Sequence, residues 1–258
     1  MANLTIRFRS RCLDRYTTFL MYLPENFEGA KTKYTERPTK TLFLLHGYIG
    51  DAGNWVPEYL SEKYNFAVVI PNGENSFWLD RKATGHDYCR FLGEELPDYV
   101  RKTFGLAKGK EDTYIMGLSM GGFGAIHTAF AYPDVFGKTV GLSGAYIHNG
   151  VAKMKPGDAP GIANYEYYRE CFGDPERLAE SDNNPEVLIK KLKAAGKQIP
   201  EIYMACGTED FLLKENREMD RFLTEQGVEH TYLESEGTHN MEFWSRYVEK
   251  FIPMLFES

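Results

Sequence analysis

Cysteine is scarce in this chain, and its arrangement predicts neither a disulfide framework nor a metal site. The four cysteines are scattered, without a C-x-x-C pair or the Cys/His spacing of a zinc site. No group of His, Asp and Glu has ligand spacing either, which disfavours a metal-dependent hydrolase. We expect free thiols in a reducing compartment and a protein that needs neither metal nor cofactor. The cysteines are Cys12, Cys89, Cys171 and Cys206.

Long apolar runs and an excess of positive charge are also lacking. No stretch approaches the roughly 20 apolar residues that span a bilayer, and the first residues alternate like a strand, without the apolar segment of a signal peptide. The formal net charge is −7 at pH 7. Nucleic acids and anionic membranes attract proteins with a basic face, so we expect neither as a partner. The sequence predicts a cytoplasmic protein that acts on a small molecule, alone or as a homo-oligomer.

A regular alternation of strand-like and helix-like segments is present instead. Continuous apolar runs, typical of strands covered on both faces, are separated by segments with apolar residues at helical spacing. The alternation predicts an α/β fold with a mostly parallel sheet flanked by helices, in one domain over residues 1–258. The expected strands are 4–13, 18–24, 41–45, 66–70, 113–118, 138–142, 202–206 and 229–235. The expected helices are 86–104, 120–131, 214–226 and 241–255.

Two segments do not follow this alternation. Residues 26–40 are polar and are expected to form a loop. Residues 147–198 are rich in glycine and proline at their start and then carry three tyrosines between 165 and 168. A segment this long between two core strands predicts an insertion that forms a small cap over the site, with a purely structural excursion as the alternative.

The residues that directly follow the expected strands are the candidates for chemistry, because open α/β sheets bind ligands beyond the carboxyl ends of their strands. Residues 117–121 read G-x-S-x-G between an apolar strand and a helix, which is the context of a nucleophile elbow. Glycines around Ser119 suit the strained turn that exposes the serine. The pattern predicts Ser119 as a nucleophile; the alternative is a serine that caps the following helix.

A serine hydroxyl needs a neighbouring base. His239 follows the last strand and comes after an acid, in the order Ser…Asp…His that the fold uses, so we predict it as the base. The acid that orients it is expected after the preceding strand, where Asp210 is preferred and Glu209 is the alternative. Among the remaining histidines, His230 lies at the wrong end of the sheet, and His86, His127 and His148 lie in segments away from the elbow. His46 follows a strand, but in this architecture that position shapes the loop.

Backbone amides and aromatic side chains complete the expected site. The oxyanion that forms on attack needs N–H donors, and the fold supplies them from the residue after the nucleophile, Met120, and from the loop after the third strand, at Tyr48. Trp55 and Trp78 lie in loops at the same end of the sheet. Both are candidates for lining a substrate pocket, with core packing as the alternative.

With these residues in place, the sequence resembles the esterase D-like α/β-hydrolases, which include tributyrin, acetyl and feruloyl esterases and S-formylglutathione hydrolase. The resemblance implies an esterase with Ser119, Asp210 and His239 as its triad. It also implies Tyr48 and Met120 as oxyanion donors, and substrates that are short-chain acyl esters, including acetylated or feruloylated sugars. The matching segments are 44–47, 117–125, 132–136, 207–210 and 237–239.

Other activities remain as alternatives to this expectation. S-formylglutathione hydrolases usually carry an Ala-Gly-Phe-Tyr-like stretch where residues 75–80 read Asn-Ser-Phe-Trp-Leu-Asp, so a thioesterase of that kind is the second choice. An acyltransferase could use the same triad. A non-catalytic binding protein with a hydrolase fold belongs to a different class. Such a protein would be expected to lack a triad member, and none is missing here.

Overall fold

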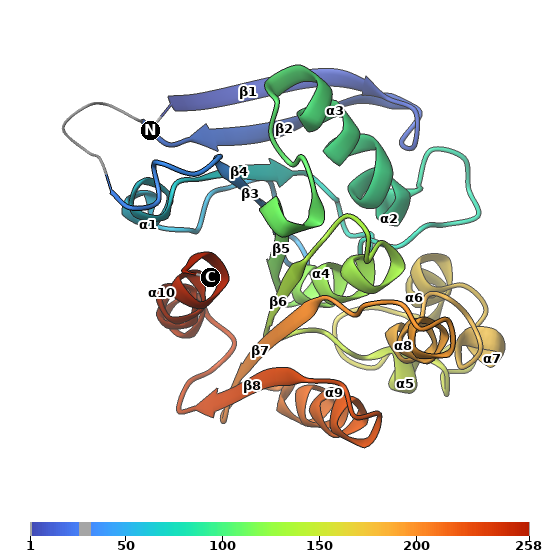
Figure 1. Ribbon diagram of the computed structural model, residues 1–258. Coiled ribbons are helices and arrows are strands. Elements are labelled where there is room, and N and C mark those ends of the chain that lie inside the picture. Colours follow the sequence, from blue (N-terminus) through green and yellow to red (C-terminus); the bar gives the residue numbers. More distant parts are fainter. Residues whose placement is uncertain (1, 26–31, 258) are drawn as a thin grey trace.

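An eight-stranded sheet forms the centre of the protein in the computed structural model, which describes residues 2–25 and 32–257. The strand order is β1-β2-β4-β3-β5-β6-β7-β8 (Figure 1). β1 and β2 are antiparallel to each other, β2 is antiparallel to β4, and the remaining neighbours are parallel. The predicted mostly parallel α/β fold is therefore confirmed. The strands are β1 (Ala2–Ser10), β2 (Arg15–Leu23), β3 (Lys40–Leu45), β4 (Phe66–Pro71), β5 (Thr113–Leu118), β6 (Lys138–Leu142), β7 (Glu201–Gly207) and β8 (His230–Ser235).

Helices cover both faces of the sheet because its central strands are apolar on both faces. Alternate residues of a strand point to opposite sides, and in β3 Leu42 and Leu44 belong to the core beneath α1 and α10, whereas Phe43 and Leu45 belong to the core beneath α3 and α4. Figure 1 shows α10 and α1 on one side of the sheet and α3, α4 and α9 on the other. The α-helices outside the insertion are α1 (Glu58–Tyr64), α2 (Tyr88–Arg90), α3 (Leu96–Phe104), α4 (Met120–Ala131), α9 (Leu213–Glu225) and α10 (Met241–Phe256).

The helix expected over residues 86–104 is continuous but irregular. α2 leads into a π-helical turn at Phe91–Glu95, and α3 follows directly. Pro97 lacks the N–H that would bond the carbonyl of Gly93 inside this turn, which favours the wider geometry there. The expected loop at 26–40 lies partly outside the described residues. Within the part of the chain that is described, no helix combines the length and apolar content needed to cross a membrane.

The insertion at 147–198 consists of four short helices that pack beside α4. Proline at the first helical positions and an asparagine or aspartate cap define the starts of α7 and α8, where Asp174 and Asn184 accept hydrogen bonds from backbone N–H groups. Leu188, Ile189 and Leu192 of α8 join the core on the α4 side of the sheet. The four helices are α5 (His148–Val151), α6 (Tyr165–Phe172), α7 (Pro175–Leu178) and α8 (Pro185–Ala194).

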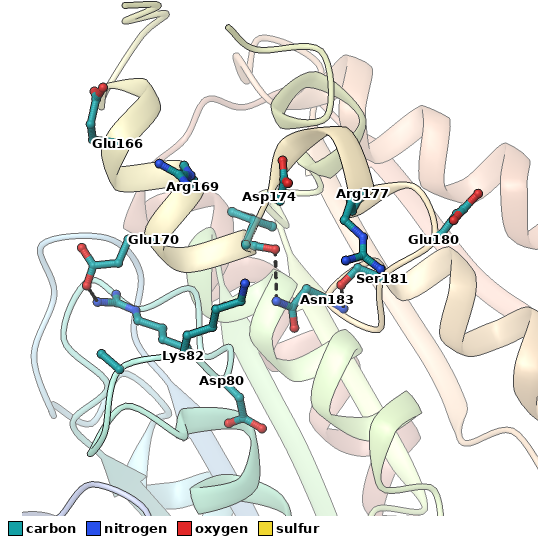
Figure 2. Close-up of a pocket in the computed structure, with 14 residues that line it drawn as sticks. Asp80, Lys82, Glu166, Arg169, Glu170, Asp174, Arg177, Glu180, Ser181 and Asn183 are labelled. Atoms are coloured by element: carbon teal, nitrogen blue, oxygen red, sulfur yellow. Dashed lines mark hydrogen bonds and ion pairs between the residues drawn. The ribbon is translucent and has the colours of Figure 1, made fainter. Parts of the chain in front are cut away.

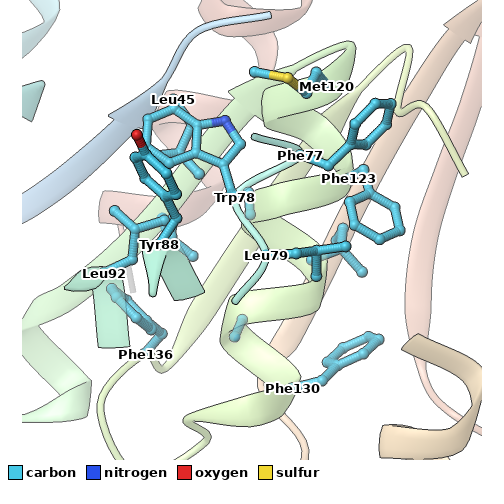
Figure 3. Packing of buried hydrophobic residues seen from close by; sticks show 14 of the residues in the cluster. Leu45, Phe77, Trp78, Leu79, Tyr88, Leu92, Met120, Phe123, Phe130 and Phe136 are labelled. Atoms are coloured by element: carbon cyan, nitrogen blue, oxygen red, sulfur yellow. The ribbon is translucent and has the colours of Figure 1, made fainter. Parts of the chain in front are cut away.

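Trp78 lies inside the protein rather than in a substrate pocket, which corrects the sequence-based suggestion. Its side chain is fully buried in the core drawn in Figure 3, and its indole N–H donates to the carbonyl of His46 at 3.3 Å. The ring fits against two glycines: a Cβ at Gly73 would lie 2.4 Å from it, and one at Gly124 of α4 2.5 Å. Trp78 therefore fixes the loop after β4 against α4.

Replacing Trp78 with alanine is expected to lower the free energy of unfolding by about 3–5 kcal/mol, because it removes a buried indole and leaves a cavity. Trp55→Ala is the matched control, since the Trp55 side chain is only partly buried and should cost clearly less. Urea unfolding followed by far-ultraviolet circular dichroism compares the two variants. Equal losses, or a Trp78→Ala protein as stable as the wild type, would contradict this role in the core.

Candidate active site

Ser119 occupies a strained turn between β5 and α4. Its backbone is left-handed, with φ of 54° and ψ of −120°, a conformation that a non-glycine residue adopts only when its surroundings hold it. The flanking glycines explain the sequence pattern. A Cβ at Gly117 would lie 2.1 Å from the carbonyl oxygen of Gly121, and a Cβ at Gly121 would lie 2.4 Å from that of Leu45. No larger residue fits at either position, so strand and helix can approach closely enough to form the turn.

Three side chains from distant parts of the chain form a hydrogen-bonded series. His239, after β8, places Nε2 2.9 Å from Ser119 Oγ and Nδ1 2.9 Å from Asp210 Oδ2. Asp210, after β7, is buried and also accepts the backbone N–H of Leu212 at 2.9 Å. Because an ionised carboxylate can only accept, Nδ1 carries the proton and Nε2 is left to accept the serine proton. This is the arrangement that activates a serine.

The electrostatics around Asp210 keep its carboxyl group ionised. Burial pushes the pKa of Asp210 upward, but the hydrogen bonds with His239 and the Leu212 amide outweigh it and hold the pKa below its usual range. The Ser143 hydroxyl adds to this lowering of the pKa. Ser143 is itself fully buried and accepts the indole N–H of Trp244 at 3.0 Å. A negative Asp210 can therefore stabilise the imidazolium that forms when His239 takes a proton.

Two aromatic rings hold the imidazole of His239. Trp244 meets it edge-on, with ring centroids 4.9 Å apart, and Phe211 lies against it at 4.5 Å. Phe211 is 63% exposed although it is large and apolar. The sequence offers two signals for these supporting residues. Ser143 directly follows a strand, and Phe211 directly follows Asp210.

Glu209, the alternative acid, has a different function in the loop. It is exposed and accepts the backbone N–H of Gly237 and the hydroxyl of Thr208, rather than contacting His239. Four of the other histidines have side-chain hydrogen-bond partners away from Ser119. His127, for example, bonds the carbonyl of Asp182, and burial lowers its pKa to about 4. The partners of three others are Gly73 for His46, Glu186 for His148 and Asp220 for His230.

The cleft in front of Ser119 has a volume of about 410 Å³. Trp55 and Tyr48 line it, together with Asp51 and Asn54. Asp51 is the one carboxylate in this lining, and no lysine or arginine belongs to it within the described residues. The Met120 side chain is fully buried in the core, so this residue can offer the site only its backbone. Its N–H belongs to the first turn of α4, where amides have no intrahelical acceptor.

A larger hollow of about 700 Å³ lies elsewhere, between residues 80–83 and helices α6 and α7. Figure 2 shows that its walls are mainly charged side chains of both signs. None of Ser119, Asp210 and His239 belongs to its lining. The smaller cleft is therefore the candidate active site, although it is not the most voluminous depression.

A strained serine at the end of a central parallel strand, hydrogen-bonded to a histidine after the last strand, defines the class: the protein is an α/β-hydrolase of the serine type. Comparison with known sequences gives the family. The model of the family described as "Putative esterase" matches residues 10–257, and the chain belongs to that family. The protein is a serine esterase.

Its relatives include enzymes with different substrates. The chain is 39% identical over 254 residues to an acetyl esterase of Caldicellulosiruptor saccharolyticus, with 96% of each protein covered. Among solved structures it is similar to FphF, a fluorophosphonate-binding serine hydrolase of Staphylococcus aureus, with a TM-score of 0.84, 26% identity and coverage of 100% and 99% of the two chains. It is also similar to the S-formylglutathione hydrolase FrmB of the same organism, with a TM-score of 0.82, 27% identity and coverage of 99% and 98%.

Asp210→Asn is expected to lower kcat by about 10³- to 10⁴-fold, because an asparagine no longer fixes the tautomer of His239 or stabilises its charged form. The neighbouring Glu209→Gln variant is the control and should stay within about tenfold of the wild type, since Glu209 contacts only the loop. Hydrolysis of p-nitrophenyl acetate measures both. A large loss with Glu209→Gln and a small one with Asp210→Asn would exchange the two assignments.

Proposed function

We propose that the protein hydrolyses esters of short-chain acids, acetate esters foremost, through an acyl-enzyme on Ser119. The observation that carries this proposal is the contact between Ser119 Oγ and His239 Nε2, 2.9 Å apart, with both residues in the lining of the cleft. A serine in this position is ready to transfer its proton as it attacks a carbonyl carbon. The 39% identity with an acetyl esterase supports a short acyl group.

The proposed reaction proceeds in two halves. In the first, Ser119 Oγ attacks the ester carbonyl, its proton passes to His239, and the carbonyl oxygen becomes an oxyanion held by the backbone N–H groups of Tyr48 and Met120. The C–O bond to the alcohol then breaks, and His239 gives its proton to the departing oxygen. In the second half, water takes the place of the alcohol and releases the acid from Ser119. Asp210 stays ionised throughout.

The cleft favours a neutral alcohol as the leaving group. Its lining contains the carboxylate of Asp51 and no lysine or arginine among the described residues, so an anionic leaving group would meet repulsion without a permanent cation to compensate it. Glutathione carries two carboxylates at neutral pH, and this argues for an oxygen ester of a sugar or simple alcohol over a glutathione thioester. Trp55 lines the cleft, and its buried indole N–H has no hydrogen-bond partner among the described residues.

Location in a reducing compartment is part of the same proposal. All four cysteines are free and buried, which supports the cytoplasm as the place of action. An S-formylglutathione hydrolase activity is the second candidate, and the similarity to FrmB favours it.

Ser119→Ala is expected to reduce hydrolysis of p-nitrophenyl esters, tested from acetate to octanoate, by at least about 1,000-fold, because the nucleophile is removed. Ser181→Ala, in the insertion away from the cleft, is the matched control and should leave the rate unchanged within about twofold. Methyl ferulate, acetylated xylan and S-formylglutathione are assayed beside the series. We expect the acetate ester to be preferred and the glutathione thioester to be slow.

Labelling with a fluorophosphonate provides a second measurement that does not depend on the choice of ester. Mass spectrometry should locate the adduct on Ser119 in the wild type and find none in Ser119→Ala. Ester hydrolysis that survives Ser119→Ala would refute the mechanism. A faster rate with S-formylglutathione than with every oxygen ester would leave the mechanism in place and replace the proposed substrate class.

A further inference from the structure

The loop that carries Tyr48 is tied to the loop after β4. The N–H of Gly73 donates to His46 Nε2 at 2.9 Å, and the N–H of Ile49 donates to the amide oxygen of Asn75 at 2.8 Å. Asn72 donates to the Asp51 carboxylate. These loops follow neighbouring parallel strands, β3 and β4, so they leave the sheet at the same edge. Polar side chains connect the two loops, and so does the buried Trp78, whose indole N–H donates to the carbonyl of His46.

Ile49 is the strained point of the first loop. Its φ is 58°, a left-handed conformation that β-branched residues strongly disfavour. Its side chain is 83% exposed, so burial does not hold the residue in place. Besides the turn that Gly50 makes with Gly47, the bond from the Ile49 N–H to Asn75 holds this backbone.

Asn75 is in turn held by the inserted helix α6. Its backbone carbonyl accepts the hydroxyl of Tyr167 at 2.9 Å and Nη2 of Arg81 at 2.8 Å. Arg81 is anchored by Glu170 of α6, an ion pair of 2.9 Å that appears as a dashed line in Figure 2. The ring of Tyr167 also packs edge-on against that of Tyr48, with centroids 5.7 Å apart. Burial raises the pKa of Tyr167, so its hydroxyl stays protonated and can donate.

We propose that Asn75 is a positioning residue for the oxyanion hole, and that helix α6 supports it in this role. The proposal rests on the proposed function, which assigns an oxyanion donor to the Tyr48 N–H. Only the two rotatable backbone bonds of Tyr48 separate its own N–H from that of Ile49. Fixing the Ile49 amide on Asn75 therefore limits the directions in which the Tyr48 N–H can point.

The role of Asn75 in the rate should differ from that of a residue that merely stabilises the fold. The oxyanion exists in the transition state and not in the bound ester, so a misdirected Tyr48 N–H lowers kcat and leaves KM nearly unchanged. The triad is untouched, so the pH profile should keep its shape. Binding of a transition-state analogue should weaken in proportion to the loss of kcat/KM.

The test compares Asn75→Ala with Asn75→Asp, which keeps an acceptor oxygen in the same place. We expect Asn75→Ala to lower kcat for p-nitrophenyl acetate by about 10- to 100-fold, with KM within about twofold, and Asn75→Asp to recover most of the loss. A trifluoromethyl ketone inhibitor should bind Asn75→Ala more weakly by the same factor as kcat/KM falls. Asn183→Ala is the matched control: it removes one side-chain bond to a backbone carbonyl, that of Phe172, within the insertion, and should change none of these values.

Tyr167→Phe is a milder test of the support that helix α6 gives to Asn75, because it removes the hydroxyl bond to Asn75 and keeps the ring against Tyr48. It is expected to lower kcat a few-fold. A folded Asn75→Ala protein with wild-type kcat, or an effect on KM alone, overturns the proposal. Should Asn75→Ala not fold, wild-type kcat in Tyr167→Phe overturns it.

Ser119→Ala is assayed in parallel. If it is inactive while Asn75→Ala is fully active, the inference about Asn75 fails and the proposed function stands; if it is active, the proposed function itself fails.

Discussion

The left-handed turn at Ser119 is the constraint on which the rest of the site depends. Such a backbone conformation costs a non-glycine residue about 1–3 kcal/mol, and the elements on either side of it supply the compensation. Every residue of β5 is buried, as is every residue of α4 except the last. Because both elements are fixed by core packing, and because Gly117 and Gly121 allow them to touch, the serine has no relaxed position to adopt.

The strand order then determines how far each partner must reach. β7 and β8 are the second and third neighbours of β5, so the loop after β8 has to turn back toward the centre of the sheet to bring His239 to Ser119. Glu209 assists this return by accepting the N–H of Gly237. Asp210 needs no such excursion, and it lies buried beneath the imidazole. The two adjacent carboxylates thus have different partners: Glu209 accepts from the Gly237 backbone, and Asp210 accepts from His239.

Much of this architecture could be predicted from the sequence because its determinants are local. Strands buried on both faces leave continuous apolar runs, and the G-x-S-x-G pattern records a close backbone approach that only glycine permits. The directions in which side chains point were harder to predict from the sequence. Trp78 follows a strand, as a substrate-binding residue would, yet Gly73 of the same loop and the distant Gly124 make room for it in the core. Asn75 has no sequence signal at all, because its partner is a backbone N–H in another loop.

The two halves of the site differ in how firmly they are held. His239 lies between two aromatic rings, and Asp210 receives bonds from buried groups, so this half is fixed by packing as well as by hydrogen bonds. The loop that carries Tyr48 has the exposed Ile49 at its tip, and it is held by a hydrogen bond to Asn75 and by the ring of Tyr167 of helix α6 against Tyr48. Local stability follows buried apolar contacts. Sequence changes in the insertion can therefore affect the loop that carries Tyr48 while Ser119, His239 and Asp210 stay in place.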